Sequence, residues 1–356
     1  MAQLLGRWFT LLGIGCMIVL LPGCPSLPDV AWEGEHVTFG ADHPEQLCGG
    51  TRHYLDQRAG ETLASLNSSP IQIEYYWLDN VADHCPESPS IIGCGAEGLV
   101  FSEWVPHMHE IVHARAGDRL PVVLEEGFAF HFGDPYPVYE MASRERLTEL
   151  LMGDLGEISG VADYARVAHF LAFLSESHGR EQLLLLDAAL GRDSSPAQVE
   201  AALEAIFGLG RERLLTAYAD YPECHGNVDT SVVCAANPVA RLGEQRAVFE
   251  RRIDCAAADV MGPYEGMAYT EDIIEIAPST EGRYLVHATG DGIAKGGNML
   301  LRRCGPCSEG GVYNRIGDDP VNLSQAQLPT GRYLVQFHVP VDAGPVDFGV
   351  HVSVGG

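Results

Sequence analysis

The hydrophobic pattern changes its period partway along the chain, and this change limits the fold more than any other feature. Between residues 140 and 221, apolar side chains recur at helical spacing in four segments, 145–151, 162–177, 180–190 and 195–207. The last segment opens with Ser195-Pro196-Ala197-Gln198, which predicts a capped helix start with proline in its first turn. Beyond Cys224 the apolar residues alternate in short runs separated by Gly, Pro, Asn and Asp. We therefore expect an α-rich region followed by a β-rich one.

The alternating runs predict an antiparallel β-sandwich. They are 273–277, 283–288, 299–303, 332–339 and 346–354. In the fourth run, alternation places Tyr333, Val335, Phe337 and Val339 on one face, toward a single core. We place the boundary between the helical region and the sandwich near residues 227–240.

The first part of the chain mixes both patterns. Residues 36–39 alternate weakly, 51–66 have helical spacing, and 71–77 read as a strand. A length of 356 residues is sufficient for two cores. The predicted fold class is α+β: a mixed α/β domain at 36–228 with a helical second half, then a β-sandwich domain at 240–356.

The N-terminus indicates export. Residues 1–23 carry one charge, at Arg7, and an apolar stretch at 11–21, as a signal peptide does. Leu21-Pro22-Gly23-Cys24 resembles a bacterial lipobox, which implies lipidation of Cys24. Residues 24–35 then form a Pro-rich tether, and the lipid would anchor the chain to the cell envelope, at the outer membrane or cell surface. In the alternative interpretation, the signal is simply cleaved and Cys24 is an ordinary thiol.

Charge and cysteine content narrow the partners and the compartment. The 49 acidic against 22 basic residues give a net charge of −27, which argues against nucleic acid as a partner. Without Cys16 and Cys24, an even set of cysteines remains for disulfides in an oxidising compartment: Cys48, Cys85, Cys94, Cys224, Cys234, Cys255, Cys304 and Cys307. Close spacing suggests Cys85 with Cys94 and Cys224 with Cys234, and Cys255 is expected to join Cys304 or Cys307 across a sheet.

One motif carries recognisable chemistry. His109-Glu110-Ile111-Val112-His113 places two histidines four residues apart, on one face of a helix if a helix forms there. Two such histidines can bind one metal ion, and the glutamate can take a proton from an activated water molecule. Pro106 suits an early helical position and Gly117 a stop. His107 lies two residues before the first ligand, which turns it to a different helical face, and we expect it to be a bystander or, alternatively, a residue of the cleft.

A second helix is expected to supply a third ligand. The segment Leu120-Pro121-Val122-Val123-Leu124-Glu125-Glu126-Gly127-Phe128-Ala129 offers two carboxylates after a turn at Gly117-Asp118. Two histidines and one carboxylate leave tetrahedral zinc an open position for water, as catalysis requires. The residues alone leave Glu125 and Glu126 as alternatives.

Together these segments resemble the gluzincin metallopeptidases, in the branch where His-Glu-x-x-His is followed by a helix reading Leu-Pro-x-Trp-Leu-x-Glu-Gly-x-Ala. The resemblance covers about residues 36–222 and implies Zn²⁺ held by His109, His113 and Glu126, with Glu110 as general base and a peptide or protein as substrate. Val123 replaces the tryptophan of that pattern. A transition-state stabiliser would come from a set of rim residues, namely His131, Tyr136, Tyr139, Tyr164 and His169.

Two other interpretations remain. Cys304-Gly305-Pro306-Cys307 has the spacing of a redox dithiol, but it follows a sandwich-like strand and no helix comes after it, which favours a structural disulfide. The chain as a whole could also be a non-catalytic envelope lipoprotein, with a degenerate protease domain and a sandwich that binds a ligand. A closed structural zinc site usually has a fourth protein ligand, typically cysteine, and no cysteine lies near the two helices in sequence.

Overall fold

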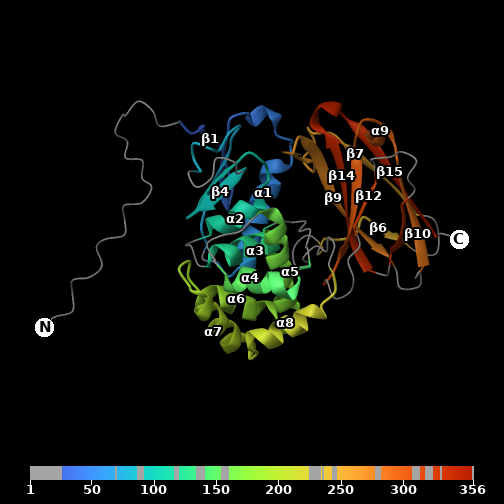
Figure 1. The fold of residues 1–356 in the computed structure, drawn as a ribbon. Helices are drawn as coiled ribbons and strands as arrows, with labels where there is room; N and C mark the ends of the chain where they lie inside the picture. The colour runs from blue at the N-terminus through green and yellow to red at the C-terminus, as the bar shows by residue number, and fades with distance from the viewer. Residues whose placement is uncertain are drawn as a thin grey trace.

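The protein is α+β, with helices and sheets arranged in two parts (Figure 1). The computed structural model describes residues 26–354 except 69, 86–91, 116–119, 134–140, 154–159, 224–233, 235, 243–246, 277–281, 307–312, 317–323 and 329–330. Several residues singled out above lie outside the described residues: Cys24, Gly117, Asp118, Tyr136, Tyr139, Cys224 and Cys307. No helix among the described residues is long and apolar enough to cross a membrane.

The first part is built on a five-stranded mixed sheet in the order β1-β2-β3-β5-β4. Its strands are β1 Val30–Glu33, β2 Val37–Ala41, β3 Ile73–Trp77, β4 Gly93–Ala96 and β5 Leu99–Ser102. Strands β2, β3 and β5 are parallel, and β1 and β4 run antiparallel at the edges. Helix α1 Thr51–Ser65 connects β2 to β3 and buries its apolar residues against the sheet, as the spacing at 51–66 predicts.

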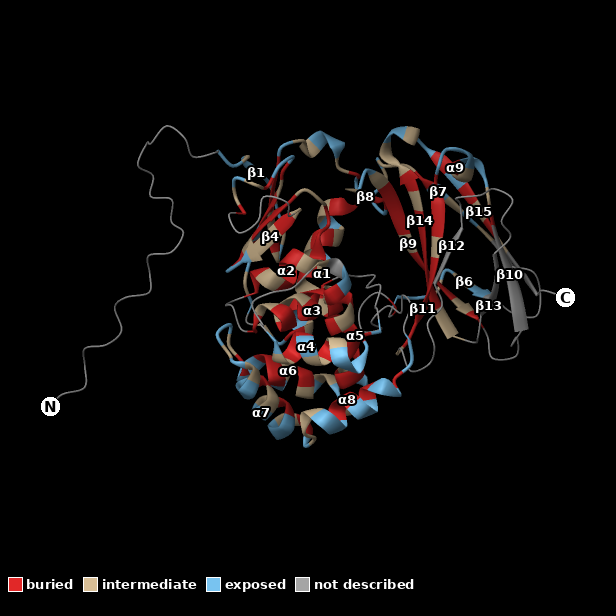
Figure 2. Cartoon of the chain, viewed as in Figure 1, coloured by how far each residue is buried: buried red, intermediate tan, exposed pale blue. Residues whose placement is uncertain are grey.

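The helices that follow pack into a second core beneath this sheet. They are α2 Met108–Ala114, α3 Val122–Phe132, α4 Arg144–Met152, α5 Val161–His178, α6 Arg180–Ala189, α7 Pro196–Phe207 and α8 Arg211–Ala219. The four predicted helical segments match α4 to α7, and Ser195 and Gln198 form the expected capping box. Buried residues of α3 and α5 lie at the centre of this core, so α3 has little freedom to move (Figure 2).

The second part contains two sheets that are antiparallel except for one strand pair. One has the order β13-β10-β15-β7, and the other β12-β11-β14-β9-β6 with β8 paired to β9. Their elements are β6 Ala240–Leu242, β7 Ala247–Ile253, β8 Met261–Tyr264, β9 Met267–Ile276, β10 Gly282–Thr289, α9 Asp291–Ala294, β11 Asn298–Cys304, β12 Tyr313–Ile316, β13 Ser324–Leu328, β14 Gly331–Pro340 and β15 Val346–Val354. Within the second sheet, β6 and β9 alone among the described pairs run parallel.

The core-facing pattern predicted for β14 is confirmed. Tyr333, Val335, Phe337 and Val339 are all buried in the core between the two sheets. Leu334 and Gln336, on the other face of the strand, are also buried, with 0% of each side chain exposed. Gln336 lies beside Glu271, which contacts Tyr54 of α1. The first part of the chain therefore covers part of the outer face of this sheet, and β14 is buried on both sides.

Three disulfides join described cysteines, which is typical of an exported protein. The predicted Cys85–Cys94 bridge is confirmed. The other predicted pairings are wrong, because Cys255 bonds to Cys48 and Cys234 bonds to Cys304.

The errors arise because both bridges join segments that are far apart in sequence, which close spacing cannot reveal. Cys48 lies three residues before α1, and the N–H groups of Gly49 and Gly50 donate to the carbonyls of Cys255 and Val260 in the β7–β8 connection. Cys304, the last residue of β11, is bonded to Cys234 and therefore not to Cys307, which lies outside the described residues.

Candidate metal centre

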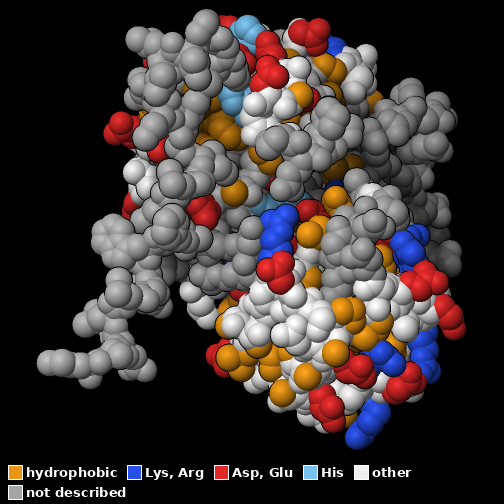
Figure 3. Space-filling view, turned by 60° about the vertical axis from the view of Figure 1, so that its left-hand side comes forward, with side chains coloured by type: hydrophobic (Ala, Val, Ile, Leu, Met, Phe, Trp, Pro, Cys, Tyr) orange, Lys and Arg blue, Asp and Glu red, His pale blue; other side chains and the backbone are white. Residues whose placement is uncertain are grey.

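Helix α2 positions both histidines of the His-Glu-x-x-His motif. It begins at Met108, two residues later than Pro106, where the sequence predicted its first turn. Its buried side is made of Met108, Ile111, Val112 and Ala114. Four-residue spacing brings His109 and His113 to one face, with side chains 15% and 14% exposed. On the face drawn in Figure 3, histidine atoms are visible near mid-height, above the helical part, so histidine side chains reach solvent there.

Helix α3 brings Glu126 to the same point. Oε2 of Glu126 lies 3.1 Å from Nε2 of His109 and 3.5 Å from Nε2 of His113. Helix α3 can sit so close to α5 because residue 127 is glycine: a Cβ there would lie 2.3 Å from Cγ1 of Val167. The Glu-Gly pair of the sequence thus combines a ligand with a close helix contact.

These three side chains fit one metal ion. His109, His113 and Glu126 bring three ligand atoms within 4.8 Å of one another. Among the described residues, they are the one group of His, Cys, Asp or Glu that does so. Tetrahedral zinc with ligand bonds of about 2.0–2.1 Å places neighbouring ligand atoms about 3.3–3.4 Å apart. The separations here are 3.0 Å between the two Nε2 atoms, 3.1 Å and 3.5 Å. The donor set of two imidazoles and one carboxylate therefore suits zinc in both chemistry and spacing.

Glu125 contacts His113 on the side of the ring that faces away from Glu126. Its Oε1 is 3.5 Å from Nδ1 of His113, the ring nitrogen that faces away from Glu126. Its Oε2 pairs with Nη2 of Arg115 at 3.0 Å, and the same Nη2 lies 2.7 Å from Asp187 on α6. A carboxylate on the outer nitrogen of a metal-binding histidine holds the ring in orientation. The structure thus separates the two candidates, with Glu126 among the ligand atoms and Glu125 outside them.

The electrostatics of the site favour a cation. Burial lowers the pKa of His113, but the carboxylates of Glu125 and Glu126 outweigh it and raise that pKa to about 10. Burial acts to raise the pKa of Glu126, but His109 and His113 hold it well below the usual range. For Glu110, which is 6% exposed, burial raises the pKa and Glu126 adds to this effect, against His109 and His113. Negative charge is thus concentrated where a divalent ion would lie.

Of the described stabiliser candidates, Tyr164 is placed next to the ligands. Its ring stacks on the imidazole of His109 with the ring centres 6.2 Å apart. Burial, followed by the charges of Glu126 and Glu110, raises the pKa of Tyr164 to about 12, so the hydroxyl keeps its proton at neutral pH. Helix α5 therefore supplies a proton donor beside the site.

The two histidine candidates are placed elsewhere. His169 is fully buried, with Nδ1 2.7 Å from the hydroxyl of Tyr218 and Nε2 3.1 Å from the carbonyl of Pro222. Both ring nitrogens hold the helical core together, so the prediction for His169 is wrong. His131 is also buried and packs edge-on against Phe132. It lies five residues after Glu126 on α3, which turns it about 140° around the helix from that ligand.

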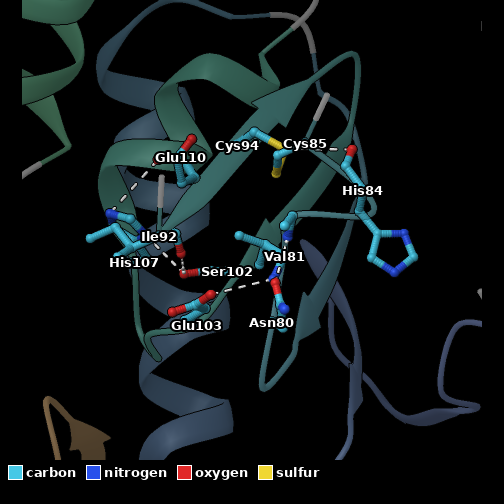
Figure 4. The surroundings of a disulfide bond; sticks show 11 residues. Asn80, Val81, His84, Cys85, Ile92, Cys94, Ser102, Glu103, His107 and Glu110 are labelled. Atoms are coloured by element: carbon cyan, nitrogen blue, oxygen red, sulfur yellow. Dashed lines mark hydrogen bonds and ion pairs between the residues drawn. A yellow bond between two sulfur atoms is a disulfide. The ribbon is translucent and has the colours of Figure 1, made fainter. Parts of the chain in front are cut away.

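His107 lies beside Glu110 and is not the bystander on another face that helical geometry favoured. It precedes α2, is 9% exposed, and lies with Nε2 3.8 Å from Oε1 of Glu110 (Figure 4). Burial lowers its pKa to about 3, with smaller effects from His109 and His113. Helical geometry would have turned His107 away, but the chain enters α2 in a non-helical conformation at this residue. No signal in the sequence marks that entry angle.

Comparisons with known proteins give little further information. No family model matches the chain, and no curated protein matches it. Among solved structures, it is similar to PliG from Salmonella Typhimurium, a periplasmic inhibitor of g-type lysozyme, at 16% identity and a TM-score of 0.22. That match covers 34% of this chain and 99% of PliG. The corresponding protein from Aeromonas hydrophila is 18% identical over 33% of this chain and 95% of its own, with a TM-score of 0.21.

Proposed function

We propose that the protein is a zinc-dependent peptidase of gluzincin type. The observation that carries the proposal is the convergence of Nε2 of His109, Nε2 of His113 and Oε2 of Glu126 within 3.5 Å of one another. Among the described residues the group has three members, which leaves tetrahedral zinc a position for water or substrate. A closed structural site would need a fourth protein ligand, so this count favours the enzyme over the non-catalytic alternative.

The roles follow from position. Zinc, when bound, supplies a Lewis acid that polarises a carbonyl and makes water more acidic. Glu110 takes a proton from the attacking water and delivers it to the leaving nitrogen; burial raises its pKa, which makes it a better base near neutral pH. The hydroxyl of Tyr164 donates a hydrogen bond to the oxyanion that develops on the substrate. Glu125 holds the imidazole of His113 in place.

The proposed location is the bacterial cell envelope, with Cys24 lipidated as an anchor at the outer membrane or cell surface. The disulfides support export. The predicted tether at 24–35 is too long, because Val30–Glu33 form strand β1 of the first sheet, so residues 24–29 would link the lipid to the folded part. A peptide or protein in the envelope is the proposed substrate.

Zinc content tests the ligand set. We would measure zinc per chain by elemental analysis in the wild type, Glu126→Gln and the matched control Glu125→Gln. We expect one zinc per chain in the wild type. In a zinc titration, the affinity for zinc should fall at least about 100-fold in Glu126→Gln and by a smaller factor of about 10- to 100-fold in Glu125→Gln. No zinc in the wild type after expression with metal supplied would favour the non-catalytic lipoprotein.

Glu110→Gln tests the reaction. The variant should retain one zinc per chain, because Glu110 is not among the three ligands, and should cleave a quenched fluorescent peptide library at least about 100-fold more slowly. Undiminished cleavage in Glu110→Gln, or loss of its zinc, would contradict the role given to this carboxylate.

A further inference from the structure

His107 is fixed on three sides next to Glu110. Its backbone N–H donates to the hydroxyl of Tyr75 at 3.1 Å. Its Nδ1 lies 2.8 Å from Oγ of Ser102, at the end of β5, and its Nε2 faces Oε1 of Glu110 at 3.8 Å (Figure 4). The imidazole therefore lies between a strand and the carboxylate, with one ring nitrogen directed at each.

Strand β4 packs over both side chains. A Cβ at Gly93 would lie 2.9 Å from Nδ1 of His107 and 3.0 Å from Cγ of Glu110. The strand pairs with β5 and is joined to the preceding loop by the bridge between Cys94 and Cys85. The absence of a side chain at Gly93 lets β4 sit directly on the His107–Glu110 pair, and this leaves neither side chain room to swing toward the strand.

The hydrogen bonds around Ser102 select one tautomer of His107. Oγ of Ser102 accepts the N–H of Trp104 at 3.0 Å, so its own hydrogen is free to donate. Three acceptors surround it: Nδ1 of His107 at 2.8 Å, the carbonyl of Ile92 at 3.5 Å, and the hydroxyl oxygen of Tyr75, which already accepts the backbone N–H of His107. The contact with Nδ1 is the short one and that with Ile92 is at the limit of a hydrogen bond, so the hydroxyl hydrogen is best placed toward Nδ1. When Ser102 donates to Nδ1, the ring hydrogen resides on Nε2, the nitrogen that faces Glu110.

We propose that His107 is a positioning residue for Glu110, with its Nε2–H held toward Oε1 by Ser102. The role in catalysis rests on the proposed peptidase function, whereas the tautomer does not. Nε2 and Oε1 are 3.8 Å apart, which is longer than a hydrogen bond. Catalytic hydrogen bonds are often long without substrate and shorten when it binds. The N–H orients one carboxylate oxygen and leaves the other directed to the site.

The tautomer is tested without any substrate. Long-range ¹H–¹⁵N NMR of the full chain, labelled at histidine and loaded with zinc, reports which nitrogen of each ring carries the hydrogen. The signal that disappears in His107→Gln identifies His107. We expect the Nε2–H form in the wild type and a shift toward the other tautomer in Ser102→Ala. An Nδ1–H form in the wild type, or no change in Ser102→Ala, would overturn the proposal.

The positioning role is tested by kinetics on a fluorogenic peptide that the wild type cleaves. His107→Phe keeps the ring volume without a donor, and we expect kcat to fall about 10- to 100-fold with KM and zinc content unchanged. His107→Gln places an amide N–H near the position of Nε2 and should restore kcat to within about threefold of the wild type.

Further outcomes separate positioning from a merely structural role. In a Glu110→Gln background, His107→Phe should have no additional effect on the residual rate, because the carboxylate it orients is gone. An equal loss in both backgrounds, a His107→Gln variant no better than His107→Phe, or loss of zinc would each overturn the proposal. If the wild type cleaves no peptide, the peptidase function fails, and the NMR result alone decides the hydrogen-bond arrangement.

Discussion

Buried charged residues show how single side chains hold the site together. Arg115 is 1% exposed, yet it pairs with Glu125 and Asp187 and lies over the ring of Phe128, 4.4 Å from its centre. A buried guanidinium is tolerated because two carboxylates compensate its charge. Through Glu125 this arginine connects α6 to His113, so the orientation of a candidate metal ligand depends on a residue 72 positions away from Arg115.

A partly buried carboxylate, Glu271, predicts a pH dependence of stability. Glu271 on β9 accepts a hydrogen bond from the hydroxyl of Tyr54 at 2.9 Å. Burial raises its pKa from 4.5 to about 7, against opposing effects from Arg58, Tyr54 and Gln336. The folded protein therefore keeps a proton that the unfolded chain releases, and the free energy of unfolding falls as pH rises from about 4.5 to 7.

Glu271→Gln removes this dependence because an amide cannot ionise. The variant should match the wild type near pH 5 and exceed its stability at pH 8 by up to about 3 kcal/mol. Urea denaturation across this pH range measures the effect, with Glu275→Gln on the same strand as the control. If the curves of wild type and Glu271→Gln run parallel, the buried-carboxylate argument is wrong.

At the scale of elements, the contact between β4 and α2 places the motif against the sheet. The helix has seven residues, too short to be stable alone, so packing must hold it. The strand approaches it closely at glycines: a Cβ at Gly95 would lie 2.2 Å from the carbonyl oxygen of Glu110. This contact involves the helix backbone, which cannot move aside as a flexible side chain could.

Gly95→Ala should therefore separate strand and helix. We expect a loss of about 1–3 kcal/mol in the free energy of unfolding and weaker zinc binding, because α2 carries His109 and His113. Denaturation and zinc titration measure both. The control is Gly191→Ala, where a Cβ would meet nothing within 4 Å. An equal response of the two variants would show that the close contact is unimportant.

At the scale of the whole molecule, the sandwich is fastened to the first part at the start of α1. The Cys48–Cys255 bridge, the hydrogen bond from Gly50 N–H to the carbonyl of Val260 at 2.9 Å, and that from Thr51 Oγ1 to the carbonyl of Gly262 at 2.7 Å lie together there. Nearby, Tyr264 of β8 packs against Trp104, which in turn contacts the ring of His107. The sandwich thus contacts Trp104, and through it the ring of His107 beside the candidate metal centre.

Two of the three described bridges differ greatly in sequence separation, which allows a matched stability test. Cys48–Cys255 spans 207 positions and Cys85–Cys94 spans 9. In the chain-entropy model, replacing both cysteines by serine costs about 5 kcal/mol for the long span and about 3 kcal/mol for the short one. Guanidinium denaturation of the two double variants compares them. A smaller loss for Cys48→Ser/Cys255→Ser would show that the hydrogen bonds at α1 hold the parts together without the bridge.

Local patterns predicted much of this architecture. Helices α4 to α7, the capping box at Ser195 and the core face of β14 follow from residue spacing, because 3.6-residue and two-residue periods are properties of short backbone segments. The pairing of His109 with His113 follows for the same reason. Short strands such as β4 and β5 gave no clear pattern, since four residues contain too little alternation, and the side chains of β4 are also small.

Relations between distant segments required the folded molecule. The partner of Cys255, the place of His169 in the helical core, and the contact of His107 with Ser102 and Glu110 all depend on how separate elements dock. Strand register and helix docking are set by burial summed over many side chains, which no short stretch of sequence contains. The chemistry of the site is therefore readable from the ligand spacing, whereas the residues that orient its glutamate emerge only when β4, β5 and α2 are packed together.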